Sequence, residues 1–258
     1  MTQIAACNSW MFSDRVLNRI LPWFPRTASL HGAAIDRLMD ASLLILFALC
    51  VLAQVLIVGG LVLRRERHVR FSTAWRWTAI AAVVALFAWM TVVAERLWST
   101  IRIARAASNA VRVEVTGVQF QWYFRYPGSD GMYGRTGPDL IDAAAGNPLG
   151  IDPADPHSRD DVVSSILILP VDRQVDLHLR AQDVVHGFYI PAMRLMQNAT
   201  PGMVSTIHFT PTRTGDYPIV CSQLCGLGHY RMRAVLRVVP AQEFTEWMQQ
   251  REKNLAER

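Results

Sequence analysis

Two long runs without a charged residue constrain the fold of this chain more than any other feature. The first extends from Ala41 to Leu63 and the second from Trp77 to Ala94. About 20 apolar residues in a helix cross the hydrocarbon core of a bilayer, so both runs are long enough, the second only just. A chain of 258 residues is too small to bury two such helices on every face. We therefore predict a transmembrane hairpin over residues 38–98, with spans at about 41–63 and 77–97 in a lipid bilayer.

Arginines between the two runs indicate how the hairpin is oriented. Four of the seven residues from Arg64 to Arg70 are arginine, and residues 1–109 carry 12 basic against 5 acidic side chains. Positive charge in a short loop marks the cytoplasmic side of a membrane. We therefore expect the N-terminal segment, residues 1–37, and everything after the second span to lie on the periplasmic or outer side of the inner (plasma) membrane. The net charge of +5 belongs to the membrane part, so it does not indicate a nucleic-acid partner.

After the second span the pattern changes from continuous hydrophobicity to alternation. Val175, Leu177 and Leu179 are separated by polar residues, which is the period of a strand with one buried face. The same alternation returns over residues 234–238, while residues 164–171 form a continuous apolar run typical of a strand covered on both faces. Several short strands separated by turn residues predict an all-β sandwich or barrel.

The predicted β domain covers residues 108–240 and contains one stretch without any period. Residues 127–158 are rich in Gly, Pro and Asp, which predicts a long surface loop. This loop is either a solvated insertion or an acidic surface that binds a basic partner, and the sequence leaves both open. In residues 241–258, apolar side chains such as Phe244 and Trp247 recur at helical spacing, so we expect a C-terminal helix packed on the domain and a short tail.

Two thiols, an imidazole and a thioether follow one another near the end of the domain: Cys221, Cys225, His229 and Met232. Soft sulfur ligands favour copper, and a weak axial Met with His and Cys is the usual setting of electron-transfer copper. A mononuclear site of that kind needs only one Cys. Two cysteines four residues apart allow two thiolates to bridge two copper ions, each of which then needs its own histidine. His186, which follows a predicted strand, is the candidate for the second histidine.

Three other interpretations of the cysteine motif compete with copper. The two cysteines would form a disulfide in an oxidising compartment, but that leaves the His and Met spacing unexplained. Zinc takes two Cys and two His, yet zinc sites rarely include Met. A thiol redox or copper-delivery motif is the third alternative.

With these residues, the chain resembles subunit II of the haem–copper respiratory oxidases, the cytochrome c oxidases. The resemblance extends over about residues 30–250 and implies a two-helix transmembrane hairpin followed by an all-β cupredoxin-like Greek-key barrel. It implies a dinuclear copper A (CuA) centre with these ligands: the bridging thiolates of Cys221 and Cys225, the imidazoles of His186 and His229, the thioether of Met232 and the backbone carbonyl of Gln223.

The resemblance also implies a place where electrons reach the copper centre. The run Gln121-Trp122-Tyr123-Phe124-Arg125-Tyr126 resembles the aromatic patch at which the family receives them. An exposed indole near the metal would give a donor haem a contact surface and a short tunnelling path, so Trp122 is the first candidate and Tyr123 the second. Ordinary strand packing is the other interpretation, since aromatic residues suit strands.

Several departures from the family bear on function. Gln223 stands where the family usually has a Glu that helps to bind magnesium at the interface with subunit I, and an amide is a weaker ligand, which argues against magnesium here. Ala74 stands where members often have a Glu associated with a proton route. Residues 196–200 lack the Lys and Asp that members carry before the following Pro-Gly turn, so the Asp-rich loop would have to supply an acidic docking surface. No Cys-x-x-Cys-His motif occurs, so we expect no haem in this chain.

The resemblance implies the electron-transfer subunit of a terminal respiratory oxidase. It would accept electrons from cytochrome c or a similar periplasmic donor and pass them to a haem in subunit I, with subunit III as a further partner. Oxygen reduction would belong to the partner, because this chain lacks the histidines in membrane helices that a haem and a second copper need. Two alternatives stay open: the CuA subunit of a haem–copper nitric oxide reductase, which Ala74 slightly favours, and a membrane-anchored copper-binding assembly protein.

Overall fold

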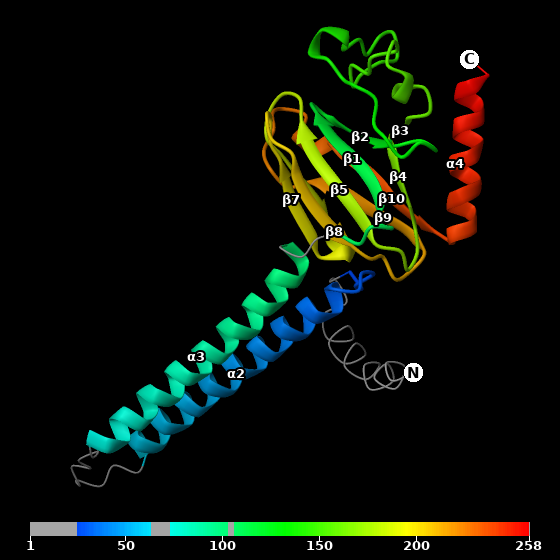
Figure 1. Cartoon of the computed structure of the whole chain (residues 1–258). Coiled ribbons are helices and arrows are strands. Elements are labelled where there is room, and N and C mark those ends of the chain that lie inside the picture. Colours follow the sequence, from blue (N-terminus) through cyan, green and yellow to red (C-terminus); the bar gives the residue numbers. More distant parts are fainter. Residues whose placement is uncertain (1–24, 63–72, 103–105, 258) are drawn as a thin grey trace, which may run out of the picture. The chain divides into compact units, whose positions relative to one another are not determined.

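The computed structural model describes residues 25–62, 73–102 and 106–257. The chain forms two compact units, a pair of long helices and a β domain, which also includes the segment just before the first helix (Figure 1). The arginine-rich segment from Arg64 to Arg70 and most of the N-terminal segment lie outside the described residues.

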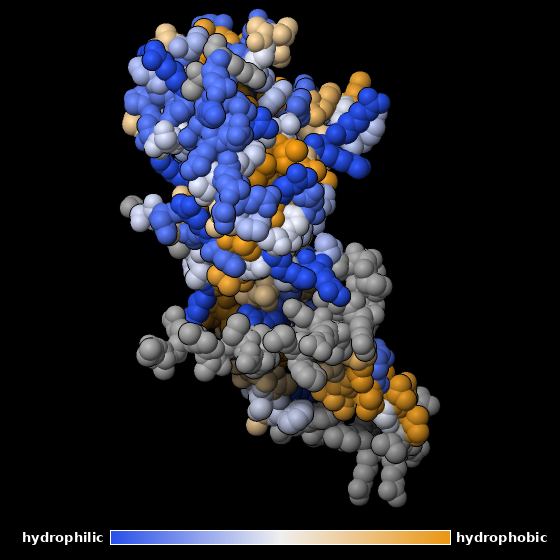
Figure 2. All heavy atoms as spheres, turned by 90° about the vertical axis from the view of Figure 1, so that its right-hand side faces the viewer, coloured by the Kyte–Doolittle hydropathy of each residue, from blue (hydrophilic) through white to orange (hydrophobic). Residues whose placement is uncertain are grey.

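Helices α2 (Gly32–Val62) and α3 (Thr73–Arg102) contain nearly all of the two uncharged runs. Most of their side chains are exposed, and each helix is long and apolar enough to cross a membrane. Figure 2 shows hydrophobic side chains along the visible part of the helices, whereas hydrophilic ones dominate the upper part of the β domain. Apolar surface on this scale is stable only where something other than water covers it, so both helices are candidate membrane spans.

The described residues of the β domain contain ten strands in two five-stranded sheets. In spatial order, the first sheet consists of β3 (Val162–Ser164), β2 (Gln121–Tyr126), β1 (Val111–Val118), β5 (Val175–Ala181) and β8 (Ser205–Phe209). The second consists of β4 (Ile166–Pro170), β10 (Arg233–Val239), β9 (Gly215–Cys221), β6 (His186–Ile190) and β7 (Leu195–Ala199). The predicted architecture, a helical hairpin followed by an all-β cupredoxin-like domain, is confirmed.

The hydrophobic core lies between the two sheets. Every second residue of β5 is buried, which matches the alternation in the sequence. Phe188 of β6 meets Trp122 and Phe124 of β2 across the core, with ring centroids 5.2 and 6.4 Å apart in edge-to-face contacts. These aromatic contacts join the two sheets beside the residues that form the candidate site.

Helix α4 (Ala241–Ala256) follows the last strand and packs against the domain. Phe244 and Trp247, whose spacing predicts this helix, contact the ring of Tyr126 with centroids 6.4 and 5.1 Å away. The Tyr126 hydroxyl donates a hydrogen bond to the carbonyl of Ile168 in β4. Strand β4 lies at the edge of its sheet. The apolar run of residues 164–171 is therefore explained by the contact with α4, not by a central place in a sheet.

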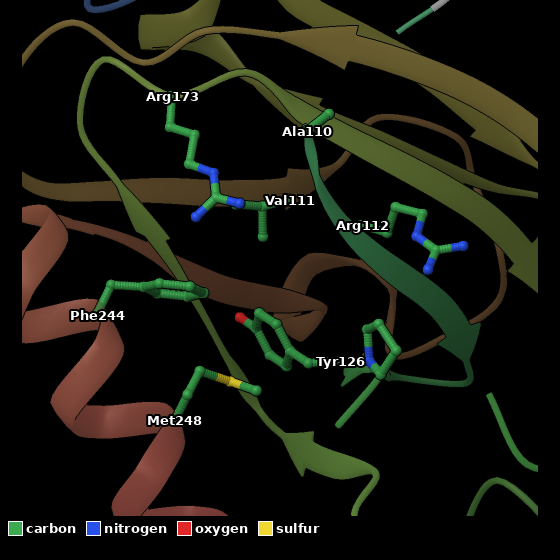
Figure 3. A pocket seen from close by; sticks show the side chains of 8 residues that line it. Ala110, Val111, Arg112, Tyr126, Arg173, Phe244 and Met248 are labelled. Carbon is green, nitrogen blue, oxygen red and sulfur yellow. The ribbon is translucent and has the colours of Figure 1, made fainter. Parts of the chain in front are cut away.

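A cavity of about 200 Å³ opens where α4 meets the start of β1 (Figure 3). Its lining includes the side chains of Val111, Tyr126, Phe244 and Met248. In Figure 3 the guanidinium of Arg173 lies above the aromatic rings, and its Nε and Nη2 donate to the carbonyl of Asn109. The cavity is at the beginning of β1, whereas the cysteine motif lies near the other end of that strand, so the two are separate.

The Asp-rich stretch is an ordered loop between β2 and β3. It contains two short 3-10 helices, η1 (Pro138–Leu140) and η2 (Pro156–Ser158). Its aspartates accept hydrogen bonds from backbone N–H groups, for example Asp155 from Arg135 at 2.8 Å. Gln182 Nε2 donates to the carbonyl of Pro148 at 3.1 Å, which attaches the loop to the residue that follows β5.

One buried arginine connects this loop to the first sheet. Arg125 of β2 is 1% exposed and forms ion pairs with Glu114 of β1, at 3.2 Å, and with Asp161 at the end of the loop. It also donates to the carbonyl of Gly134 at 2.6 Å. A buried charge is tolerated where such partners satisfy it, so Arg125 fixes both ends of the loop.

The segment before α2 belongs to the β domain. The N–H of Ala28 donates to the carbonyl of Ala192 at 2.7 Å, and Ser29 Oγ donates to the carbonyl of Met193 at 2.8 Å, both in the 3-10 helix η3 (Pro191–Met193). Ala28 is 1% exposed. The sequence gives no sign of this contact, because the segment is short and has no period.

Replacing Asp161 by Ala should destabilise the β domain by about 3 kcal/mol, because the Arg125 guanidinium stays buried without one of its partners. Chemical unfolding of the purified protein, followed by tryptophan fluorescence, measures this change. Asp139→Ala is the matched control, since Asp139 is exposed on the same loop and should cost less than about 0.5 kcal/mol. Equal effects of the two substitutions would contradict the role assigned to Arg125.

Candidate metal centre

The cysteine motif lies on the loop between two neighbouring antiparallel strands. Cys221 ends β9 and Met232 directly precedes β10, and the Cys221 N–H donates to the Met232 carbonyl at 3.2 Å. Between them, the 3-10 helix η4 (His229–Arg231) turns the chain back. The strand pairing thus closes the loop and gathers its donor atoms.

Three donor atoms of the loop surround the Cys225 thiol. Its Sγ is 3.9 Å from Cys221 Sγ, 3.8 Å from Met232 Sδ and 3.6 Å from Nδ1 of His229. Both cysteines are free thiols, and their separation is well beyond the roughly 2.05 Å of a disulfide bond. The cysteines and Met232 are buried, whereas His229 is half-buried.

His186 joins this group from the adjacent strand. Strand β6 pairs with β9 in the register Phe188↔Cys221, and residues two apart on a strand share a face. A ring nitrogen of His186 and the Sγ atoms of Cys221 and Cys225 lie within 4.8 Å of one another. The histidine side chain is completely buried. The side chains that the sequence analysis names as ligands come from two separate segments, and the structure brings them together.

Asp183 controls how His186 presents its ring. Its Oδ1 lies 2.8 Å from His186 Nε2, while Nδ1 is buried and has no hydrogen-bond partner among the described residues. Burial raises the pKa of Asp183, but hydrogen bonds from His186 and from the backbone N–H groups of Gln119 and Val184 outweigh it and hold the pKa below its usual value. The ionised carboxylate accepts a hydrogen bond from the Nε2–H group, which keeps the ring proton on Nε2 and leaves Nδ1 with a free lone pair. A metal ion would satisfy this orphaned acceptor.

The donor set of the site fits copper. The two thiols and the thioether are soft ligands, the two imidazoles also suit copper, and a thioether is unusual for zinc. Burial, followed by the neighbouring Cys221 thiol, raises the pKa of the Cys225 thiol to about 11. A metal ion that binds here must therefore displace a proton from the thiol, as metals do at cysteine sites.

Gln223 presents its backbone, not its side chain, to the site. Its carbonyl oxygen accepts a hydrogen bond from Cys221 Sγ at 3.1 Å, whereas the residue itself is exposed. A second backbone group of the loop, the Cys225 carbonyl, accepts from Gln119 Nε2 at 2.5 Å. The loop is thus held from the turn between β1 and β2, whatever side chain stands at position 223.

Two glycines allow the site to be packed this closely. A Cβ atom on Gly117 would lie 2.8 Å from Cδ2 of His186 and 3.0 Å from Cζ3 of Trp122. A Cβ atom on Gly228 would lie 2.3 Å from the ring of Phe120. Carbon atoms in folded proteins do not approach so closely, so β1 and the loop reach their neighbours only because both positions lack a side chain.

The expectation that Trp122 is an exposed indole is wrong. Strand β2 alternates, and Trp122, Phe124 and Tyr126 lie buried on its inner face. Trp122 contacts the ring of His186 edge-to-face, with centroids 5.7 Å apart. Tyr123 is half-buried on the other face, and its hydroxyl donates to Gln121 Oε1 at 3.3 Å. Neither residue therefore offers a large exposed aromatic surface.

Phe120 is the aromatic residue beside the site that the sequence analysis missed. It is 37% exposed, and its ring lies against Gly226 and Gly228 of the cysteine loop. It lies in a turn before β2 begins, so the strand period does not apply to it. The turn itself contains neither Gly nor Pro, the residues by which a turn is usually predicted from sequence.

Apolar side chains of the cysteine loop also face solvent. The exposed fractions are 78% for Leu224, 99% for Leu227 and 64% for Tyr230. Together with Phe120 we refer to them as the apolar collar. Several exposed apolar side chains in one short segment are typical of an interaction surface.

The β domain holds a buried set of sulfur and imidazole donors, and the chain has two candidate membrane spans. These features are typical of the class of membrane-anchored metal proteins. Within this class, residues 111–239 match the family described as cytochrome c oxidase subunit II, periplasmic domain. The match covers half of the chain, which therefore belongs to the cytochrome c oxidase subunit II family.

Individual relatives carry the same description. The chain is 40% identical over 145 residues to the alternative cytochrome c oxidase subunit 2 of Bradyrhizobium diazoefficiens and 32% identical over 140 residues to the cytochrome c oxidase subunit 2 of Synechocystis sp.. These stretches cover 55% and 54% of this chain, and 52% and 33% of the relatives, so the match spans about half of their length or less. The crystal structure of the periplasmic domain of subunit II of cytochrome oxidase from Bradyrhizobium japonicum is 26% identical, with a TM-score of 0.42 over 58% of this chain and 98% of that domain.

Gly117→Ala should weaken metal binding at least ten-fold, because the added methyl group displaces the buried His186 ring. Copper retained after dialysis against a competing chelator measures the affinity. Gly137→Ala is the control, since its Cβ would meet only Leu140, at 3.6 Å. Unchanged copper retention in the Gly117 variant would show that the His186 ring does not contribute to binding.

Proposed function

We propose that this chain holds a dinuclear copper A centre, with these ligands: Cys221, Cys225, His186, His229, Met232 and the carbonyl of Gln223. The observation that carries the proposal concerns the buried His186 ring. Its Nε2 is hydrogen-bonded to Asp183, whereas its Nδ1 has no hydrogen-bond partner in the described structure. One of its nitrogens lies within 4.8 Å of both thiols. Membership of the cytochrome c oxidase subunit II family supports the assignment.

When bound, the copper pair would take up and release one electron at a time. The protein keeps the ligands in place while this happens. The Asp183 carboxylate orients the His186 ring, and Gln119 holds the backbone of the loop. The close contacts at Gly117 leave the His186 ring little room to move, and those at Gly228 do the same for the loop. Ligands that move little between redox states keep the reorganisation energy of electron transfer small.

We infer that the chain is the electron-transfer subunit of a terminal respiratory haem–copper oxidase. It would accept electrons from cytochrome c or a similar periplasmic donor and pass them to a haem in subunit I, with subunit III in the same complex. The family and the donor set support this role. The reduction of oxygen would take place in subunit I.

We further propose that the β domain lies on the periplasmic side of the inner membrane. Two helices that are long and apolar enough to span a bilayer support a location in a membrane. The four arginines from Arg64 to Arg70 would face the cytoplasm by the positive-inside rule. Both ends of the hairpin then emerge on the other side, where a soluble donor reaches the copper site.

Phe120 is the residue at which we propose that electrons reach the site. It combines exposure with direct contact to the cysteine loop, whereas Trp122 is completely buried. Trp122 would serve as an inner contact of His186, and Tyr123 is the remaining candidate. The apolar collar gives a donor haem edge a surface to which it can dock without losing many hydrogen bonds.

The Asp-rich loop is the acidic surface we propose for a basic donor. Asp139 and Asp142 are exposed near its tip. Gln182, which holds the loop through the Pro148 carbonyl, directly precedes Asp183, so the loop is attached next to the copper ligands. An acidic surface of this kind accelerates the encounter with a basic partner at low ionic strength.

Cys221→Ser should abolish the mixed-valence signal, because two thiolates are needed to bridge two copper ions. The purified chain is loaded with copper and examined by visible absorption and electron paramagnetic resonance. Cys50→Ser is the control, since Cys50 lies on α2 outside the loop and should leave the purple colour unchanged.

Other results of the same experiment would contradict the proposal. A wild-type chain that binds a single copper, binds zinc in preference to copper, or contains a Cys221–Cys225 disulfide in its native membrane has no dinuclear centre. A colourless Cu(I) protein that yields its metal to a weak chelator would instead support a role in copper delivery.

Phe120→Ala should slow reduction of the site by its donor about ten-fold, since loss of a central aromatic contact typically costs 1–2 kcal/mol. The copper spectrum should stay unchanged, because Phe120 is no ligand. Stopped-flow reduction of the copper-loaded protein by cytochrome c measures the rate. Tyr123→Ala tests the remaining candidate and should leave the rate of reduction unchanged. If only substitution of Trp122 slows reduction, while the spectrum is intact, electrons enter through Trp122 instead.

A further inference from the structure

Gln54 places a polar side chain in the middle of a membrane span. It stands 13 residues after Ala41 and nine before Leu63, within the uncharged run. At 1.5 Å per residue these distances are about 20 and 13 Å along the helix, too far for the side chain to reach the polar head groups at either end. An amide in hydrocarbon keeps the full cost of its lost water contacts unless it finds another hydrogen-bond partner.

The hydroxyl side chains within the two uncharged runs form hydrogen bonds with their own helix. Ser42, Thr78 and Thr91 each donate to the carbonyl four residues earlier, at 2.6, 3.0 and 2.9 Å. Gln54 is exposed and forms no hydrogen bond with any residue in the described part of the chain, α3 included. The amide of Gln54 on α2 therefore needs hydrogen-bond partners from outside the two helices.

We infer that Gln54 marks the face of α2 that packs against a transmembrane helix of the catalytic partner subunit, and that it hydrogen-bonds there with a polar side chain or an unpaired backbone carbonyl. The inference rests on the proposed function, which requires such a subunit in the same membrane. Residues one turn away, Cys50 and Val58, share this face, and both are exposed. The bond fixes the rotation of α2 about its own axis, because an amide turned toward lipid has no partner.

Moving the amide around the helix tests the inference. Gln54→Leu should weaken retention of the partner subunit roughly three- to twenty-fold, the range measured for hydrogen bonds between membrane helices. The matched control is the double variant Gln54→Leu/Leu56→Gln, which has the same composition and hydropathy but presents the amide about 200° away on the helix. It should be as defective as the single variant. The haem-to-copper ratio of the complex, purified over a series of detergent concentrations, measures retention.

The copper spectrum separates failure of this inference from failure of the proposed function. Neither variant touches the copper ligands, so both should keep the mixed-valence signal; a wild-type chain without that signal refutes the proposed function. If the haem-to-copper ratio is unchanged by Gln54→Leu, or is restored by the double variant, the face is wrongly assigned. A photoreactive residue at Val58 should crosslink to the partner subunit, and one at Leu56 should not. A product made of two copies of this chain would overturn the inference.

Discussion

The pairing of β6 with β9, and of β9 with β10, is the constraint on which the site depends. The first pairing brings His186 next to Cys221, and the second closes the loop that carries the other donors. Successive side chains of a strand point to opposite faces, so a slip of one residue in either pair would turn a ligand away from the cluster. The edge-to-face contacts of Phe188 with Trp122 and Phe124 hold this register from inside the core.

Features with a strong local period were predictable from the sequence. The uncharged runs became α2 and α3, the alternation from Val175 to Leu179 became β5, and the apolar spacing at the end became α4. The cysteine motif was predictable for a chemical reason, because thiolate, imidazole and thioether at such spacing have few other uses. The same reasoning named His186 as the second imidazole from another segment, and the structure places its ring near the two thiols.

Features that depend on contacts between distant segments were not predictable. Which aromatic residue is exposed depends on where the turn before β2 ends, and no Gly or Pro marks that turn in the sequence. For this reason Trp122 was expected on the surface and Phe120 was overlooked. The attachment of the Asp-rich loop to the first sheet depends on Arg125, whose partners Glu114 and Asp161 are 11 and 36 residues away. Asp183 is only three residues from His186 in the sequence and forms a hydrogen bond with its ring. Its role in orienting the ring could not be predicted, because only the folded structure shows that the other ring nitrogen has no partner.

The burial of the donor atoms limits how a metal ion could reach them. The thiols and the thioether lie beneath the loop, and of the ligand side chains only His229 is partly open to solvent. If the site binds copper as proposed, the metal ion would reach these donors only through a movement of the loop, which would break the hydrogen bond between Gln119 and the Cys225 carbonyl. A donor bound to the apolar collar would hinder that movement, so under the proposed function copper would have to be inserted before the donor docks.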